Sequence, residues 1–212
     1  MTETFSLAII GFLSGLVVLM VVTTTAFIKL SIVFFIIRNA LGLQQVPSNL
    51  ILQTFATVLA IYISMPVFHS IYEVFKEAGE PTSIEAWVDV MQKASAPVQE
   101  FISRNTGEEH KEYFQSVTAK IWKDSAFTTT KEDLVILVPA FIITEMSRAF
   151  EIGFLLYLPF VAIDLVLTII LMAMGMMMVP PTILSVPFKL LLFIMIGGWT
   201  KLIQGLVLTY SV

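Results

Sequence analysis

The chain of 212 residues is more apolar and less charged than a soluble protein of its size. Apolar residues make up 57% of the chain and charged residues 13%, and the mean hydropathy is +0.89. In soluble domains about 45–50% of residues are apolar and about 25% are charged. These fractions exclude a self-contained soluble fold, because so few polar side chains cannot cover its surface. A membrane or a large protein partner must cover the remainder.

The charges are concentrated in the middle of the chain. Of 28 charged residues, 7 basic and 11 acidic ones lie within 76–133, so the entire net charge of −4 belongs to that segment. There is no basic stripe, which argues against nucleic acid as a partner, and no cysteine, which excludes disulfides and thiolate metal sites. The sequence is therefore that of a hydrophobic protein with a polar insert.

The apolar stretches predict four long helices, since about 20 apolar residues cross the hydrocarbon core of a bilayer. The first two are expected at about 5–37 and about 50–75. The third is expected at about 134–173, with a break, and the fourth at about 188–210. Prolines within these segments each remove a backbone donor and predict kinks.

The polar segment 76–133 is predicted to be an amphipathic helical hairpin, because its apolar residues recur at helical spacing. Thr82 and Thr106 are expected to cap its two helices, and Pro97 is expected to bend or split the first. The two apolar faces would cover each other or a neighbouring subunit. Together these elements predict an all-α, integral membrane-type protein of kinked helical hairpins, in three parts: 1–75, 76–133 and 134–212.

The first short loop carries the orientation signal. Lys29 and Arg38 flank it, and the segment after the second helix is acidic. The positive-inside rule places the loop in the cytoplasm and both the N-terminus and the insert on the opposite side. Lys29 and Arg38 are expected to snorkel towards the membrane surface.

Other charges lie inside the apolar segments, where facing lipid would be costly. They are Glu145, Arg148, Glu151, Asp164, Lys189 and Lys201. The first three are spaced i, i+3, i+6 and form one helical stripe; they either neutralise one another or set the register against a neighbouring subunit. Asp164 has no local partner, so Lys189 or Lys201, in the same subunit or the next, is the expected counter-charge.

Two further patterns concern packing. Gly11 and Gly15 form a GxxxG pair that permits close helix approach. Five methionines occur among the seven residues 172–178, followed by Pro180 and Pro181, which end the helix. Methionine adapts to irregular gaps, so these residues either fill space at a turn or form an apolar ring that closes a pore by excluding water.

No catalytic constellation is present, and no enzyme activity, cofactor or metal is expected. His69 and His110 are far apart in sequence, and each is expected on a helix surface. No nucleotide, hydrolase or zinc motif occurs. The sequence leaves open a small secondary transporter or proton channel with Asp164 as the coupling residue, since lone acids in membrane helices are functional candidates.

Several ordered blocks together resemble the FliP/SctR family. They are Phe27-Ile-Lys29, Arg38-Asn-Ala-Leu-Gly42, Gln44-Gln-Val-Pro47, Pro139 to Phe154 (PAFIITEMSRAFEIGF), Pro159 to Val166 (PFVAIDLV), Met174 to Pro181 (MGMMMVPP) and Ser185 to Phe193 (SVPFKLLLF). The short N-terminus and the Arg38–Gly42 loop are more similar to the injectisome branch than to the flagellar one. One departure is Gly197-Gly198-Trp199, where many members have Asp-Gly-Trp.

The resemblance implies an export-gate subunit of a bacterial type III secretion system. Members form a homopentamer that joins SctS-type and SctT-type subunits in a helical ring at the centre of the basal-body rings. It implies a location in the inner membrane, with the assembly extending into the periplasmic space and much of it held above the bilayer. Unfolded secreted proteins would pass through the axis, and the family's methionine gasket corresponds to Met176, Met177 and Met178.

Overall fold

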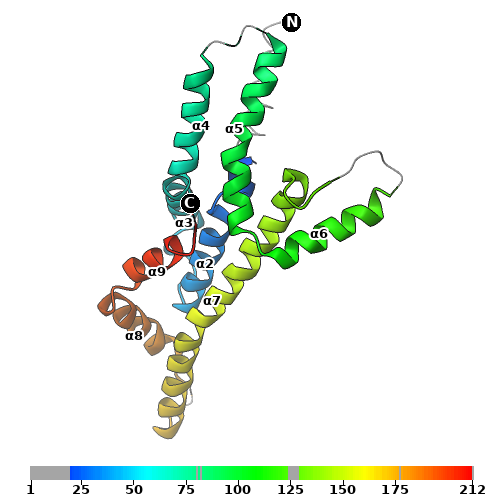
Figure 1. Cartoon of the computed structure of the whole chain (residues 1–212). Helices are drawn as coiled ribbons and strands as arrows, with labels where there is room; N and C mark the ends of the chain where they lie inside the picture. The colour runs from blue at the N-terminus through cyan, green and yellow to red at the C-terminus, as the bar shows by residue number, and fades with distance from the viewer. Residues whose placement is uncertain (1–19, 80, 82, 124–128, 177, 212) are drawn as a thin grey trace, which may run out of the picture. The chain divides into compact units, whose positions relative to one another are not determined.

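The computed structural model describes residues 20–79, 81, 83–123, 129–176 and 178–211. Within these ranges all regular structure is α-helical, which confirms the all-α prediction. The helices are α2 (Phe27–Ala40), α3 (Asn49–Ile63), α4 (Met65–Ala78), α5 (Ile84–Asn105), α6 (Glu108–Ile121), α7 (Leu134–Ala173), α8 (Thr182–Met195) and α9 (Gly198–Val207) (Figure 1).

One helix and two bent pairs have the length and composition of membrane spans. Helix α7 has 40 residues, and the mean hydropathy of its most apolar 18-residue window is 2.5. The pairs α3–α4 and α8–α9 are bent by 55° and 63° at short breaks. These features confirm a membrane-type helical protein with kinked apolar segments.

The chain forms two compact units. Among the described residues, the first unit contains 20–28, Ser211 and most of Ala60–Glu145, and the second contains Lys29–Leu59 and Met146–Tyr210. In the first unit, the core includes buried Ile102 and the edge-on rings of Phe101 and Phe141, with centroids 6.3 Å apart.

Aromatic rings organise the core of the second unit. Phe34 of α2 stacks on Phe55 of α3 at 5.4 Å between centroids and meets Trp199 of α9 edge-on at 6.2 Å. Trp199 in turn meets Phe193 of α8 at 5.5 Å, and Phe193 lies 6.3 Å from Phe160 of α7. These contacts hold five helices around one cluster, since such pairs contribute about 0.5–1.5 kcal/mol beyond area burial.

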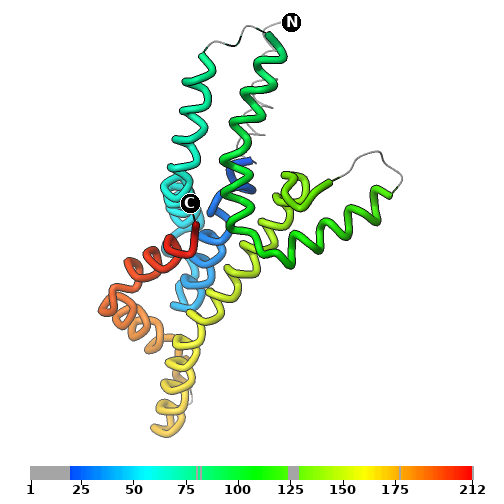
Figure 2. The backbone as a smooth tube through the Cα atoms, viewed as in Figure 1, coloured from blue at the N-terminus to red at the C-terminus, as the bar shows by residue number. Residues whose placement is uncertain are grey.

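The break predicted within 134–173 is wrong, because α7 is continuous through Pro139 and Pro159 (Figure 2). Of the two alternatives for Pro97, a split of the first insert helix is wrong, since Pro97 lies inside α5, and a bend there stays a prediction. A proline removes only one hydrogen bond of a helix. The hydrogen bonds on either side of it remain, and they keep a long helix continuous.

The first, second and fourth predicted helices are interrupted instead. The second breaks at Ser64, between α3 and α4. The described part of 5–37 is helical at 20–24 and again from Phe27, where the hydroxyls of Thr24 and Thr25 bind the carbonyls of Met20 and Val21 at 2.7 Å each. Such back-bonding bends helices. The fourth segment begins at Thr182 rather than 188 and breaks at Gly197, whose left-handed φ of 66° suits glycine.

The predicted hairpin partner within the insert is also corrected. Helix α5 packs side by side with α4, not with α6, among the described residues (Figure 1). Ser83 rather than Thr82 caps α5, accepting a hydrogen bond from the amide of Ala86 at 3.1 Å, and Thr82 lies outside the described residues. Gly107, not Thr106, occupies the N-cap position of α6, without a side-chain hydrogen bond. The Thr106 hydroxyl donates to the carbonyl of Ile102.

Candidate functional site

An ion pair with a buried ammonium and a half-exposed carboxylate connects three helices of the second unit. The ammonium of Lys189 on α8 lies 2.5 Å from Oδ2 of Asp164 on α7 and donates to the carbonyl of Ala40 at the end of α2, at 3.0 Å. The side chain of Lys189 is 4% exposed and that of Asp164 is 44% exposed. A buried ammonium must be paired, and the last carbonyls of a helix attract cations, so both partners stabilise Lys189 at this position.

A cleft of about 320 Å³ adjoins this ion pair. Asn39, Gly42 and Tyr157 line it, together with Ser185 one helical turn before Lys189. The Ser185 hydroxyl is fully buried and, within the described ranges, has no hydrogen-bond partner. The sequence analysis missed Ser185, although its spacing of four residues from Lys189 on an apolar helix was a usable signal.

The methionine-rich segment forms the C-terminal turn of α7. Gly175 has a φ of 75°. The amide of Met176 donates to the carbonyl of Leu171 at 2.9 Å, and the amide of Gly175 donates to the carbonyl of Met172 at 3.0 Å. This pair of bonds is a Schellman motif, which requires a residue that tolerates a left-handed backbone. Helix α8 then starts after Pro181.

The methionine side chains beside this turn are solvent-exposed in the isolated chain. Met178 is 97% exposed and Met176 is 38% exposed, whereas Met177 lies outside the described residues. Gap-filling therefore does not account for Met178. Its thioether is available to a neighbouring molecule.

The remaining predicted site residues differ widely in their surroundings. Along α7, Glu145 is fully buried, Arg148 is half-buried and Glu151 is exposed. Lys201 is exposed on α9, and Asp164 pairs with Lys189 instead. Gly11 and Gly15 lie outside the described residues. The roles of the charged stripe, within the chain or against a neighbour, both stay predictions.

Lys29 does not snorkel, which corrects the expectation for this residue. It is completely buried, with its ammonium 3.6 Å from the centroid of the Tyr210 ring. The negative face of an aromatic ring attracts a cation, and the attraction strengthens when the cation is desolvated. Arg38 is also engaged within the chain, because its Nη1 donates to the side chain of Asn49 at 2.5 Å and to the carbonyl of Pro47 at 3.3 Å.

In the first unit, Lys111 of α6 binds neighbours on both sides. Its buried ammonium lies 2.8 Å from Glu108, 3.0 Å from the hydroxyl of Ser103 on α5 and 3.6 Å from Glu132 before α7. The hydrogen bond and charge of Lys111 lower the pKa of Glu108 below its ordinary value of 4.5. In a second ion pair of this unit, the hydrogen bond to Glu112 raises the pKa of Lys131 above its ordinary value.

His110 is not a free surface residue, contrary to expectation. It is half-buried, and its Nδ1 lies 2.9 Å from the hydroxyl of Thr144 on α7. That hydroxyl also accepts from the amide of Gly107 at 3.1 Å and donates to the carbonyl of Ala140 at 2.8 Å. Because the hydroxyl proton serves Ala140, Nδ1 of His110 carries a proton and donates. The first turn of α6 is thereby attached to α7.

The polar contacts of these sites join one helix to another. In the described part of the chain, no group of three or more His, Asp or Glu side chains could hold a metal ion. The described residues contain an ion pair between the apolar helices α7 and α8, an exposed methionine-rich turn after α7, and the polar helices α5 and α6. This combination defines a helical membrane protein built for contact with other chains.

Comparison with known proteins agrees with this class. The profile of the FliP family matches residues 9–206, so this chain belongs to the FliP family. It is 49% identical over 199 residues to "Probable translocation protein y4yL" of Sinorhizobium fredii, covering 93% of this chain and 90% of that protein.

Two further relatives are similar over nearly their whole length. The chain is 41% identical over 212 residues to "Yop proteins translocation protein R" of Yersinia pestis, covering 99% of this chain and 97% of that protein. It is 38% identical over 209 residues to "Harpin secretion protein HrcR" of Erwinia amylovora, covering 98% and 95%. The resemblance inferred from the sequence blocks is confirmed.

Proposed function

We propose that this protein is a pore-forming subunit of the export gate of a bacterial type III secretion apparatus. The observation that carries the proposal is the near-full-length match to relatives named for translocation and secretion. At the coarser level, the family places the chain in the protein-export apparatus. The finer role is that unfolded substrate proteins pass along an axis surrounded by copies of this chain.

The proposed assembly is a homopentamer joined by SctS-type and SctT-type subunits within the basal-body rings. It sits in the bacterial inner membrane and extends into the periplasmic space, with the polar segment on the periplasmic side. The apolar surface of α7 supports an assembly of this kind. Only 11% of the most apolar 18-residue window of helix α7 is buried in the isolated chain. The apolar surface that this leaves needs a covering protein partner or lipid.

The methionine turn is the proposed barrier to leakage. Beyond the end of α7, Met178 is almost fully exposed and Met176 is partly exposed, and a ring of such thioethers would exclude water, and so ions, when the channel is idle. Flexible, unbranched side chains also yield to a passing chain. The carrier alternative is disfavoured, because Asp164 is already held in an ion pair with Lys189 and the relatives are translocation proteins.

The test replaces Met176, Met177 and Met178 with Ala in the assembled apparatus. Ion leakage across the membrane should rise while secretion continues, because the apolar constriction widens. The matched control replaces three exposed methionines outside the methionine-rich segment, Met65, Met146 and Met195, and should leave leakage unchanged. Unaltered leakage in the gasket variant, with an intact assembly, would count decisively against the barrier.

A further inference from the structure

An apolar groove of about 380 Å³ lies within the second unit and is lined by Pro47, Ile51, Leu52, Phe55 and Trp199. We name it the α3–α9 groove, because its walls come from the start of α3, the residue before it and α9. Ile51, Leu52 and Phe55 lie on one side of α3, since residues at i, i+1 and i+4 share a helical face. Ile51 is 59% exposed and Leu52 is 2% exposed, so the groove opens to the outside and reaches the core.

A guanidinium lies at the Pro47 end of this groove. Nη1 of Arg38 donates to the carbonyl of Pro47 at 3.3 Å and to the side chain of Asn49 at 2.5 Å, and Asn49 lies one turn before Leu52 on α3. Over the described residues, Arg38 forms no ion pair with a carboxylate, and its buried Nε has no hydrogen-bond partner. The ring of Phe35, with its centroid 5.3 Å from Cζ, attracts this charge but does not neutralise it.

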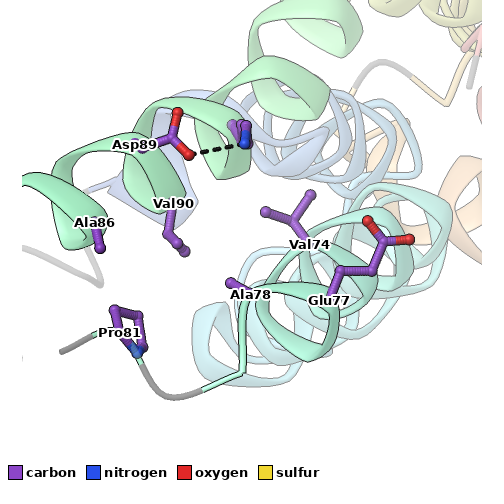
Figure 3. Close-up of a pocket in the computed structure, with 8 residues that line it drawn as sticks. Val74, Glu77, Ala78, Pro81, Ala86, Asp89 and Val90 are labelled. Atoms are coloured by element: carbon purple, nitrogen blue, oxygen red, sulfur yellow. Dashed lines mark ion pairs between the residues drawn. The ribbon is translucent and has the colours of Figure 1, made fainter.

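The cleft between α4 and α5 in the first unit has the opposite charge arrangement. Its volume is similar, about 360 Å³, but the carboxylate of Asp89 in its wall is paired with Lys93 at 2.7 Å (Figure 3). Glu77 also lines this cleft. A cation that is already paired with a carboxylate leaves no net positive charge for an anionic ligand. The α3–α9 groove differs because the charge of Arg38 remains uncompensated beside an apolar wall.

We propose that the α3–α9 groove binds an anionic phospholipid. An acyl chain lies along Leu52 and Phe55 against the ring of Trp199, and the phosphate accepts hydrogen bonds from Arg38, because a guanidinium matches the geometry of phosphate oxygens. An apolar wall with an uncompensated cation at one end is complementary to a molecule with an apolar tail and an anionic head. A membrane-type helical chain meets such lipids directly, and they attract basic residues at the membrane surface. The proposal does not depend on the export function.

The test uses Trp199 as its reporter. The chain has three tryptophans, so the W87F/W122F protein keeps only Trp199, and both replaced side chains are exposed. The full-length protein in detergent micelles is titrated with phosphatidylglycerol whose acyl chains carry bromine, which quenches indole fluorescence on close approach. We expect saturable quenching, half-complete at a mole fraction about fivefold lower than for phosphatidylcholine with the same acyl chains, the effect of one basic residue near anionic lipid. Unbrominated phosphatidylglycerol should restore the fluorescence, and inorganic phosphate, which has no acyl chain, should not.

Variants in the same background assign the preference to Arg38. R38Q should bind the two brominated lipids equally, and R38K, which keeps the charge, should retain most of the preference. K201Q is the matched control: it removes one positive charge from an exposed residue of α9, about 200° around the helix from Trp199, and should preserve the fivefold difference. Equal half-saturation by the two lipids in the W87F/W122F protein, or a preference that survives R38Q, would overturn the proposal. So would recovery of fluorescence by inorganic phosphate, or the absence of saturable quenching that is expected if protein covers the groove.

Discussion

At the scale of single residues, the Asp164–Lys189 pair shows how burial distributes an ion pair unequally. Lys189 is 4% exposed and Asp164 is 44% exposed. If Lys189 is lost, water can solvate the remaining carboxylate. If Asp164 is lost, a buried ammonium keeps only the Ala40 carbonyl, and an uncompensated buried charge costs about 3–5 kcal/mol.

We therefore predict that D164N lowers thermal stability more than K189M does. The expected cost is about 3 kcal/mol for D164N and about 1 kcal/mol for K189M, whose remaining carboxylate is half-exposed. The double variant should be more stable than D164N alone, because no buried charge is left unpaired. Thermal unfolding of the detergent-solubilised protein measures this order. A larger loss of stability in K189M than in D164N, or a double variant whose loss equals the sum of the two single losses, would show that Asp164 does not stabilise the buried charge of Lys189.

A second residue-scale prediction concerns acid. Lys111 lowers the pKa of Glu108 below 4.5, so the folded chain binds fewer protons at this site than the unfolded chain. The stabilisation is present above pH 4.5 and is lost as the pH falls through the lower folded-state pKa. Amide protection of the first turn of α6, corrected for intrinsic exchange, should fall in that window. In E108Q the fall should be smaller, and an equal fall in both proteins would exclude Glu108 as its source.

At the scale of elements, close approach of α7 to α2 depends on one missing side chain. A Cβ on Gly153 would lie 2.3 Å from Cδ1 of Ile36, 3.1 Å from its Cγ2 and 3.3 Å from its Cβ. The flexible end of Ile36 could move, but its branch point could not move without shifting α2. Gly153 thus sets the separation of these helices, as small residues do in membrane proteins.

We predict that G153A destabilises the protein by about 1–3 kcal/mol through overpacking. Adding I36A should recover part of that loss, because the clashing methyl groups are removed. G205A is the control: nothing lies within 4 Å of its added Cβ, and alanine should be neutral or stabilising by up to about 1 kcal/mol in a helix. Thermal unfolding of these three variants and of the unchanged protein measures the differences, and a neutral G153A would contradict the close approach.

At the scale of the whole molecule, the isolated chain leaves much apolar surface uncovered. Leu155, Leu165 and Ile194 are 60%, 59% and 69% exposed. Lipid can cover such residues, but it cannot hydrogen-bond the backbone freed at the breaks near Thr25 and Gly197. Neighbouring protein can meet both needs, which favours an assembly over a solitary bundle.

We predict that the protein, co-expressed with the SctS-type and SctT-type subunits of the proposed assembly, purifies as one particle containing five copies of this 23.7 kDa chain. Native mass spectrometry gives the copy number directly. Expression of the chain with an unrelated membrane protein controls for detergent aggregation. A monomer under every gentle extraction condition would contradict the assembly and favour a carrier-like protein.

The helical class and the family were accessible from the sequence because both depend on local pattern. Uninterrupted apolar stretches report helices directly, and blocks such as Met174–Pro181 are contiguous in the chain. The positions of breaks were less accessible. Pro139 and Pro159 look like breakers but lie in a continuous α7, whereas Gly197 and the run of Thr23 to Thr25 interrupt other helices.

The amino-acid sequence by itself determined the hydrophobic character of this protein, its polar middle segment and the end of α7 at the methionine turn, since each follows from neighbours in the chain. Only the tertiary structure decided that Lys189 is the counter-charge of Asp164, that Lys29 is buried against Tyr210 and that α5 packs on α4. Those contacts join residues distant in sequence, and their energy depends on burial and distance, which no local pattern encodes.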